Sequence, residues 1–224
     1  IGAVAIQQSN PNVIWVGTGE GNPRNSLNLG SGIYRSLDAG KTWTGMGLEK
    51  TICLHRIVID PVDPTTIYAA AIGNPYAEHS ERGVFKTTDG GATWQKILYV
   101  NDTTGCAELV MDPSNPNKLI ASMWQFRRTP WNMKSGGEGS GLYITVDGGK
   151  NWKKLSKEDG IPSGELGRIG LAFARSMPKR VYAKIESSKN GFYRSNDGGF
   201  TWSLVNSDAR QVTDRPFYYQ EIYV

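Results

Sequence analysis

Ser36-Leu-Asp38-Ala-Gly40-Lys-Thr-Trp43 is the first of four stretches that share one pattern, in which Ser or Thr, Asp, Gly and Trp stand at fixed spacing. The other three are Thr87-Thr-Asp89-Gly-Gly91-Ala-Thr-Trp94, Thr145-Val-Asp147-Gly-Gly149-Lys-Asn-Trp152 and Ser195-Asn-Asp197-Gly-Gly199-Phe-Thr-Trp202. They recur about every 50 residues along the chain. A repeat of this period predicts one small structural unit that is used four times.

Two further anchors recur in register with this pattern. A Gly-apolar-aromatic triplet precedes each stretch: Gly32-Ile-Tyr34, Gly83-Val-Phe85, Gly141-Leu-Tyr143 and Gly191-Phe-Tyr193. A proline precedes a short apolar strand in each unit: Pro11, Pro64, Pro116 and Pro178. Each unit therefore reads as four short antiparallel strands, and the predicted fold class is an all-β propeller. The predicted blades span about 1–50, 51–101, 102–156 and 157–207, and 218–224 is expected to be the first strand of a further blade.

The repeated stretch has the chemistry of a hairpin turn. Glycine supplies the positive φ of the turn, and the Asp carboxylate accepts hydrogen bonds from N–H groups of the same turn. The Trp begins the next strand, where burying its ring between neighbouring sheets stabilises the fold by about 2–3 kcal/mol. Because the motif stands in four equivalent places, its residues are predicted to be structural. They are Asp38, Asp89, Asp147 and Asp197, with Trp43, Trp94, Trp152 and Trp202.

These stretches resemble the Asp-box (BNR) repeats of sialidases, xyloglucanase-type propellers and the sortilin family. Gly17-Thr-Gly-Glu20-Gly-Asn-Pro-Arg24-Asn and Trp124-Gln-Phe-Arg-Arg-Thr-Pro-Trp131 are most similar to bacterial sortilin-like proteins, which are often labelled glycosyl hydrolases. The resemblance implies a larger ring of six or more blades, with the remaining blades supplied by a longer chain; a self-closed ring of four blades is the alternative. It also implies a secreted, periplasmic or cell-surface location.

Strand order predicts where a ligand binds. In an antiparallel meander, the turns between the first and second strands share one end with the Asp-boxes. The other loops share the opposite end. Those other loops, about 18–31, 73–82, 125–140 and 187–190, and the links about 48–54, 99–105, 155–167 and 205–218, differ in length. Irregular loops on a rigid scaffold usually carry binding residues, so we expect any ligand at their end.

Three groups of residues at that end are candidate ligand contacts. Arg56, Glu108, Arg168 and Glu221 stand near the starts of successive first strands, where alternating charges either bind a zwitterionic or polyhydroxy ligand or pair with one another. Loop 123–140 carries Trp124, Arg127, Arg128 and Trp131, which either form an aromatic and guanidinium platform or cover apolar surface. Loop 18–31 adds Glu20 and Arg24.

Three functions remain open on the sequence. The first is a recognition module for a peptide or a glycan. The second is a glycoside hydrolase, whose carboxylate pair would come from Glu20, Glu78, Glu81, Glu108, Glu138 and Glu221. The third is a structural scaffold. A sialidase is disfavoured, because Gly167-Arg168-Ile169-Gly170 lacks the proline of that family's Arg-Ile-Pro signature.

Composition and motifs disfavour other classes. The net charge of +4 comes from scattered basic residues, whereas a nucleic-acid-binding protein usually has a concentrated stripe. No apolar run approaches the roughly 18 residues that a membrane span needs. No metal-ligand spacing or phosphate-binding loop is present, so no metal or cofactor is expected. Cys53 and Cys106 precede consecutive first strands, which leaves either an inter-blade disulfide or two buried free thiols.

Overall fold

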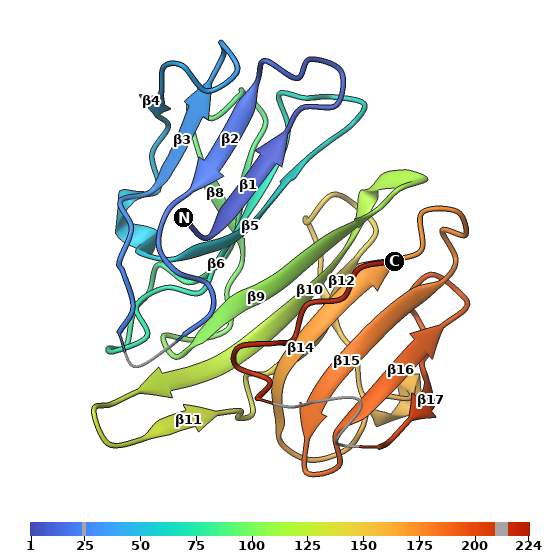
Figure 1. Ribbon diagram of the computed structural model, residues 1–224. Coiled ribbons are helices and arrows are strands. Elements are labelled where there is room, and N and C mark those ends of the chain that lie inside the picture. The colour runs from blue at the N-terminus through green and yellow to red at the C-terminus, as the bar shows by residue number, and fades with distance from the viewer. Residues whose placement is uncertain (24–25, 209–214) are drawn as a thin grey trace. The chain divides into compact units, whose positions relative to one another are not determined.

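A computed structural model describes residues 1–23, 26–208 and 215–224. The chain divides into two compact units, Ile1–Cys106 and Ala107–Val224, which are described separately below. The described residues contain seventeen β-strands, two short 3-10 helices and no α-helix (Figure 1). No helix among them is long and apolar enough to cross a membrane.

The first unit holds two four-stranded antiparallel sheets, each a meander in chain order. The first sheet consists of β1 (Ala3–Ile6), β2 (Ile14–Gly17), β3 (Ile33–Ser36) and β4 (Thr44–Gly45). The second consists of β5 (Leu54–Ile59), β6 (Ile67–Ala71), β7 (Gly83–Thr87) and β8 (Gln95–Leu98). The 3-10 helix η1 (Glu49–Thr51) lies in the link between them. Trp15, Ile33, Leu54 and Phe85 belong to one buried cluster to which both sheets contribute.

The second unit holds the other two sheets. The third sheet consists of β9 (Thr104–Asp112), β10 (Asn115–Arg128), β12 (Gly141–Thr145) and β13 (Lys153–Lys154), with β11 (Met133–Ser135) added beside β10. The fourth consists of β14 (Leu166–Phe173), β15 (Val181–Ser187), β16 (Gly191–Ser195) and β17 (Ser203–Asn206). The 3-10 helix η2 (Lys157–Asp159) lies in the link between these sheets. A second buried cluster includes Ile120, Leu171 and Trp202 and joins the two sheets.

The Asp-boxes and the turns between first and second strands lie at the same end of each sheet, as predicted. In every sheet an amide of the box donates to a carbonyl of that turn. The four bonds are Ala39 N to Asn12 O (2.9 Å), Gly90 N to Thr65 O (2.9 Å), Gly148 N to Asn117 O (2.8 Å) and Gly198 N to Lys179 O (2.7 Å). The predicted meander is therefore confirmed, and the sheets are propeller blades.

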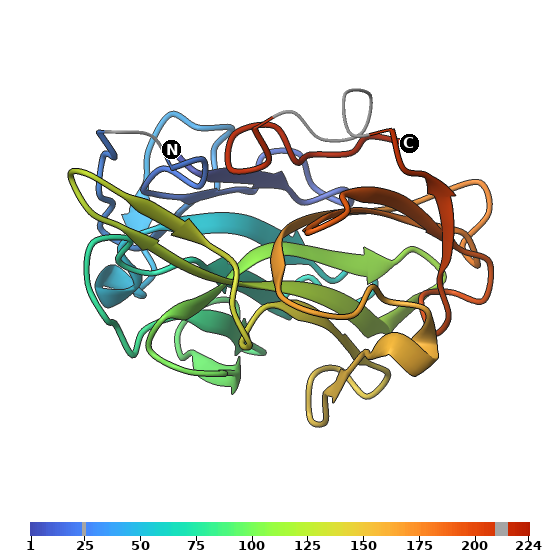
Figure 2. The ribbon, with the colours of Figure 1, turned by 90° about the horizontal axis from the view of Figure 1, so that it is seen from below.

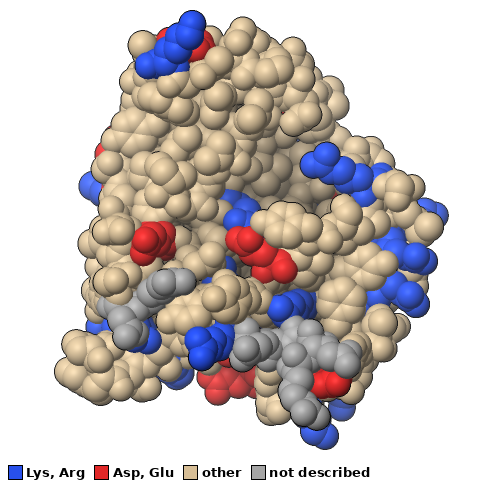
Figure 3. Space-filling model, viewed as in Figure 1, with Lys and Arg blue, Asp and Glu red and all other residues tan. Residues whose placement is uncertain are grey.

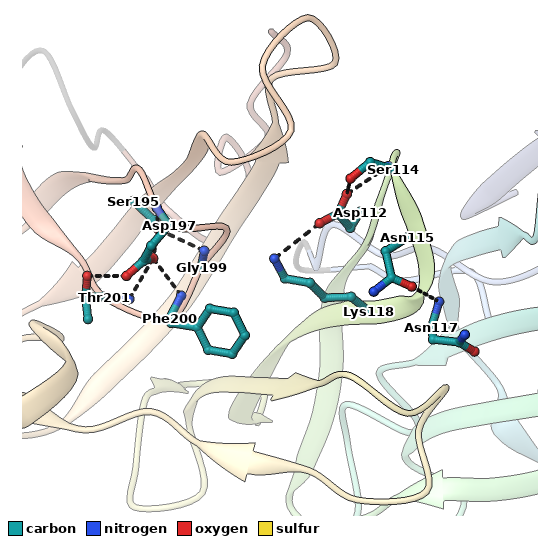
Figure 4. Close-up of polar contacts among 10 residues, drawn as sticks. All are labelled: Asp112, Ser114, Asn115, Asn117, Lys118, Ser195, Asp197, Gly199, Phe200 and Thr201. Atoms are coloured by element: carbon teal, nitrogen blue, oxygen red, sulfur yellow. Dashed lines mark hydrogen bonds and ion pairs between the residues drawn. The ribbon is translucent and has the colours of Figure 1, made fainter.

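The fourth Asp-box shows how the motif closes its own turn (Figure 4). Asp197 Oδ1 accepts hydrogen bonds from Ser195 Oγ (2.7 Å), Phe200 N (3.0 Å) and Thr201 N (3.0 Å), and Oδ2 accepts from Thr201 Oγ1 (2.5 Å). Ser195 Oγ in turn accepts from Gly199 N at 2.8 Å. One carboxylate thus satisfies several donors that the turn would otherwise leave unpaired.

The same contacts hold the other three box aspartates. Hydrogen bonds from the Thr42 side chain and amide, together with one from Ser36, lower the pKa of Asp38 to about 2. Equivalent bonds lower the pKa values of Asp89 and Asp147 well below the ordinary range. A carboxylate that accepts several hydrogen bonds in its charged form is stabilised in that form.

The box tryptophans differ in burial. Trp202 is buried, and Trp94 packs edge-on against Trp15 of the preceding sheet while its Nε1 donates to Met46 O at 2.7 Å. Trp152 is partly buried. Trp43 is 43% exposed, which corrects the expectation that all four rings are buried between sheets. Trp94 and Trp202 each pack against the preceding sheet of their unit. The first sheet has no preceding sheet within its unit, so Trp43 has no such sheet to pack against.

The expectation that 218–224 is the first strand of a further blade stays a prediction, because no further blade is present among the described residues. These residues form no strand; instead they run beside β14, as Figure 1 shows. Gln220 Nε2 donates to Arg168 O (2.9 Å) and Lys184 O (2.7 Å), and Lys184 Nζ donates to Tyr219 O (2.6 Å). A strand requires a ladder to a neighbouring strand, and the described residues supply none for this segment.

Cys53 and Cys106 are buried free thiols, so the disulfide alternative is not realised. Burial raises the pKa of Cys53 to about 11. A thiol with so high a pKa is protonated at neutral pH and unreactive in the folded chain.

Candidate functional site

The site lies at the end of each unit opposite the Asp-boxes, which we call the long-loop end. It carries the loops between second and third strands and the links between sheets. Hydrogen bonds join a loop to a link in both units: Gly30 N to Ile52 O (2.7 Å), His79 N to Asp102 O (2.9 Å) and Gly137 N to Leu166 O (3.3 Å). These loops and links therefore meet at one end of each unit, as the strand order requires.

Loop 18–31 is tied down from within. Both oxygens of the Glu20 carboxylate accept from Asn28, one from its amide N and one from its Nδ2, each at 3.2 Å. Glu20 is partly buried by this arrangement. Arg24, the other candidate in the loop, lies outside the described residues. The Glu20 carboxylate therefore stabilises the conformation of its own loop.

Loop 73–82 is held by a single arginine that sequence reasoning did not select. Arg82 is fully buried, and its guanidinium donates to four backbone carbonyls. They belong to Ile72 (2.9 Å), Ala77 (3.0 Å), Thr103 (3.4 Å) and Asn74. The planar fork of arginine can serve several acceptors at once, so this side chain joins the loop to the following link.

The four predicted ring charges do not form an exposed ring. Glu108 and Arg168 are buried, Arg56 is partly buried, and Glu221 lies outside any strand. The sheet register also separates the two arginines: Arg56 pairs with Ala70, whereas Arg168 falls in a bulge between Leu166 and Ile169. All four side chains contact other parts of the protein. All four residues are thus at least partly buried, and both alternatives, ligand binding and pairing with one another, stay predictions.

Loop 123–140 folds into a hairpin in which the predicted platform is divided. β10 and β11 pair through Phe126 with Ser135 and Arg128 with Met133, and Figures 1 and 2 show this hairpin extending beyond the four-stranded sheet. Trp124 is buried and stacks on Phe126, with ring centroids 4.3 Å apart. Trp131 at the hairpin tip is 85% exposed.

Arg127 and Arg128 lie on the hairpin between the buried and the exposed tryptophan, and both are partly exposed. The turn that follows is closed by Thr129 N to Asn132 O at 2.8 Å and by Asn132 N to Thr129 Oγ1 at 3.0 Å. This closed turn presents Trp131 to solvent on an ordered support. Of the predicted platform, Trp131, Arg127 and Arg128 are thus accessible, and Trp124 supports them from the interior.

A partly buried polar network fixes the base of the hairpin. Trp124 Nε1 donates to Ser135 Oγ (3.0 Å), and Ser135 Oγ donates to Glu186 Oε2 (2.7 Å). The same carboxylate oxygen accepts from Arg168 N at 2.7 Å. A Cβ at Gly167 would stand 2.2 Å from that oxygen, so only glycine admits the carboxylate here. The hairpin is thereby connected to β15 of the neighbouring sheet.

A pocket of about 320 Å³ opens between the end of this loop and the link to the fourth sheet. It is lined by Gly137, Glu138, Ser140, Lys154, Leu155, Ser156, Lys157, Ile161, Pro162, Ser163, Gly164 and Leu166. Its volume falls at the lower end of the range for small-molecule sites. Leu155, Ile161 and Leu166 are buried and form apolar wall, whereas the serines and charged residues supply polar groups.

Lys154 is the best-positioned cation of the pocket. Its ammonium donates to Glu138 O at 2.6 Å and lies 5.6 Å from the centroid of the Tyr143 ring. Desolvation lowers the pKa of Lys154, an effect that the negative charge of Glu138 partly offsets. Lys154 is thus held in place with N–H groups left for a ligand.

On the face drawn in Figure 3, basic side chains gather along the right-hand side, and acidic side chains lie mainly near the centre and the bottom. Among the described residues, no group of three or more potential ligands that could hold a metal ion is present.

The model of the Sortilin-Vps10 family, described as sortilin, neurotensin receptor 3, matches residues 31–161, which is more than half of the chain. The chain belongs to the Sortilin-Vps10 family. The matched range includes the first three Asp-boxes and the β10–β11 hairpin. It ends in the link that forms one side of the pocket.

The curated relatives of this Sortilin-Vps10 chain are named xyloglucanases. A probable oligoxyloglucan-reducing end-specific xyloglucanase of Neosartorya fischeri is 29% identical over 206 residues, covering 87% of this chain and 22% of the relative. A xyloglucanase of Paenibacillus sp is 23% identical, covering 100% of this chain and 19% of the relative. The chain thus spans about a fifth of the length of these two relatives.

Solved structures similar to this Sortilin-Vps10 chain confirm the propeller fold. A crystal structure of an ancestral GH74 enzyme has a TM-score of 0.68 at 19% identity, covering 92% of this chain and 24% of that one. The GH74 xyloglucanase from Xanthomonas campestris has a TM-score of 0.65 at 17% identity, covering 92% and 30%. At such identities the likeness concerns the fold alone.

Sequence reasoning predicted the long-loop end of this Sortilin-Vps10 chain as the binding end, which stays a prediction, and it did not select the pocket. Lys154 follows the box tryptophan in what reads as an ordinary outer strand, and Ser140 precedes a Gly-apolar-aromatic triplet. The one available signal was the length of the link 155–167, which exceeds that of the links 48–54 and 99–105. That link supplies Ile161 and Ser163 to the pocket.

Proposed function

We propose that this chain binds a glycan at the long-loop end of its second unit. The pocket between residues 137–140 and 154–166 is the observation that carries the proposal. Its apolar wall suits the C–H face of a sugar ring, and its serine and lysine groups suit hydroxyls. The curated relatives are named for an activity on xyloglucan, which supports a polysaccharide over a peptide.

Trp131 supplies a second contact for an extended glycan. Its ring is exposed at the tip of the hairpin, and Arg127 and Arg128 stand beside it on β10. An exposed aromatic face on an ordered support offers apolar area at little entropic cost, and guanidinium groups donate to hydroxyl oxygens. A chain of sugars is expected to use both the ring and the pocket.

Affinity electrophoresis against a panel of polysaccharides that includes xyloglucan tests the proposal. Loss of one stacking contact costs about 1 kcal/mol, so Trp131→Ala should weaken binding about fivefold. Trp43→Ala is the matched control, because Trp43 is also exposed but lies at the Asp-box end. Glycan binding is refuted if no polysaccharide retards the chain. Equal losses in the two variants would remove the hairpin from the site, and a chain that binds nothing would be a scaffold.

Hydrolysis is the second candidate function, because the match to relatives named xyloglucanases extends over 87% to 100% of the chain in the two cases described. Glycoside hydrolysis needs two carboxylates about 5–10 Å apart across the scissile bond. Glu138 is exposed and lines the pocket. If it takes part, Glu138→Gln should abolish the release of reducing ends from xyloglucan, whereas Glu158→Gln should not. No release by the unchanged chain excludes this candidate for residues 1–224.

Further blades of a longer chain are proposed partners of the first sheet. Val4 of β1 is 61% exposed, whereas Ile57 of β5 and Leu171 of β14, which occupy the same cross-strand row, are 9% and 3% exposed. An apolar position that is buried in two sheets and exposed in a third suggests a missing neighbour. A chain extended by the preceding repeat should therefore unfold at a higher temperature than residues 1–224, and equal midpoints would contradict this.

An extracytoplasmic location is proposed on the same resemblance, since polysaccharide substrates lie outside the cell. Fractionation of cells that produce the protein tests it, and recovery only with the cytoplasmic fraction would refute it.

A further inference from the structure

The charges of the pocket are unbalanced. Lys154 and Lys157 line it on one side, and Glu138 is the only acidic residue among its lining residues. Lys157 lies in η2 and is exposed, and Glu138 is exposed as well. The lining therefore carries one more positive than negative charge, which favours a ligand with an acidic group.

Lys154 forms no direct ion pair among the described residues, although the negative charge of Glu138 acts on it. Its ammonium contacts the backbone oxygen of Glu138 and the face of Tyr143, and no further contact of this side chain is present in the described part of the chain. The neighbouring Lys153 differs, because its Nζ pairs with Asp159 at 2.6 Å. The two adjacent lysines thus differ: Lys153 forms a direct ion pair, whereas Lys154 is near the charge of Glu138 without an ion pair to it.

We propose that the pocket binds an acidic sugar, a uronic acid residue of a glycan, and that Lys154 receives its carboxylate. This inference rests on the proposed function and names the substrate class of the same site. A carboxylate can accept the N–H groups that Lys154 does not donate to Glu138, in a charge-assisted hydrogen bond. Lys154 is an exposed residue whose pKa is lowered by partial desolvation, and an anion beside it would oppose that effect.

The rest of the pocket favours a sugar as the carrier of the carboxylate. Leu155, Ile161 and Leu166 form an apolar wall that a pyranose ring can cover. Ser140 Oγ accepts from Gln125 N at 2.9 Å, which leaves its hydroxyl hydrogen to donate to a ligand, and Ser163 is exposed at the rim. Hydroxyl groups facing an apolar surface match a polyhydroxy ring better than a free inorganic anion.

Two ligands that differ only at one group test the inference: methyl glucuronide, which carries the carboxylate, and methyl glucoside, which does not. Their affinities for residues 1–224 are compared by NMR titration. A charge-assisted hydrogen bond should favour the glucuronide about tenfold or more. Lys154→Met should abolish this preference, and Lys154→Arg should retain it. Lys153→Met is the matched control and should leave it unchanged, because that side chain is paired outside the pocket.

The pH dependence of the preference for the glucuronide provides an independent test. Only the protonated form of Lys154 attracts the carboxylate, and its pKa lies below the ordinary value for lysine. The preference for the glucuronide should therefore disappear as the pH rises through the lowered pKa of Lys154. Urea unfolding of each variant checks that the fold is intact.

The outcomes separate this inference from the proposed function. Equal affinities for the two methyl glycosides, or a preference that survives Lys154→Met, would overturn the acidic sugar while leaving glycan binding in place. Tighter, Lys154-dependent binding of a short polyglutamate peptide would overturn the sugar in favour of an acidic peptide. A chain that binds neither glycoside nor any polysaccharide of the panel would overturn both proposals.

Discussion

Replacing Lys118 with alanine should destabilise the second unit strongly, because it leaves a buried carboxylate without its cation. Lys118 Nζ lies 3.2 Å from Asp112 Oδ2, and both side chains are less than a tenth exposed (Figure 4). The ammonium also lies 5.0 Å from the centroid of the Phe200 ring and 5.8 Å from that of Phe173. These contacts join the β9–β10 turn to the Asp-box of the fourth sheet.

The size of the destabilisation depends on the hydrogen bonds that Asp112 retains when Lys118 is removed. Removing one partner of a buried ion pair costs about 3–5 kcal/mol. Asp112 Oδ1 still accepts from Ser114 N at 2.8 Å and from Ser114 Oγ at 2.7 Å, so the lower end, about 3 kcal/mol, is expected. Burial alone would raise the pKa of Asp112, but the bonds from Ser114 and Lys118 lower it overall. For a chain of this size the loss corresponds to about 6–12 °C in Tm.

Urea unfolding of Lys118→Ala measures this loss, and a double-mutant cycle of the unchanged chain, Lys118→Met, Asp112→Asn and the double variant isolates the ion pair. The double variant should lie within about 1 kcal/mol of the unchanged chain, since both charges are gone and the volumes are similar. Lys153→Ala is the control, because the Lys153–Asp159 pair is shorter, at 2.6 Å, but its lysine is 62% exposed and should contribute under about 1 kcal/mol. The reasoning is refuted if Lys118→Ala costs less than about 1 kcal/mol or if the cycle shows no coupling.

Three further predictions concern the hairpin, the Asp-boxes and the thiols. Glu186→Ala should speed amide hydrogen exchange in the β10–β11 hairpin, because Ser135 loses its acceptor. Glu186→Gln should leave exchange nearly unchanged, and equal exchange in both variants would contradict the prediction. Asp38 has a pKa of about 2 in the folded chain, so its contribution to stability is present above its ordinary pKa and is lost as the pH falls through 2. In Asp38→Ala the unfolding midpoint should therefore fall less steeply as the pH is lowered. Cys53 and Cys106 should react with a thiol reagent only after unfolding, and rapid reaction of the native chain would show that they are accessible.

The strands and the Asp-box turns were predictable from the sequence because their physics is local. Asp197 bonds to residues no more than four positions away, and the glycines that permit the turn lie inside the motif. Recurrence of such a unit then dictates the antiparallel order, and the order dictates which loops share an end. The resemblance to the sortilin family was carried by the same residues, and the family match confirmed it.

Burial and pairing at the long-loop end were decided only by the tertiary structure. Trp124 and Trp131 belong to one sequence motif, yet one is buried and the other is 85% exposed, because Trp124 stacks on Phe126 within β10 whereas Trp131 lies at the hairpin tip. Lys153 and Lys154 are neighbours in the chain, but alternation along β13 sends one to Asp159 and the other to the pocket. Contacts of this kind join segments whose separation in sequence varies with loop length. No repeat pattern encodes them, and only the folded packing of loop against link selects the side chains that meet.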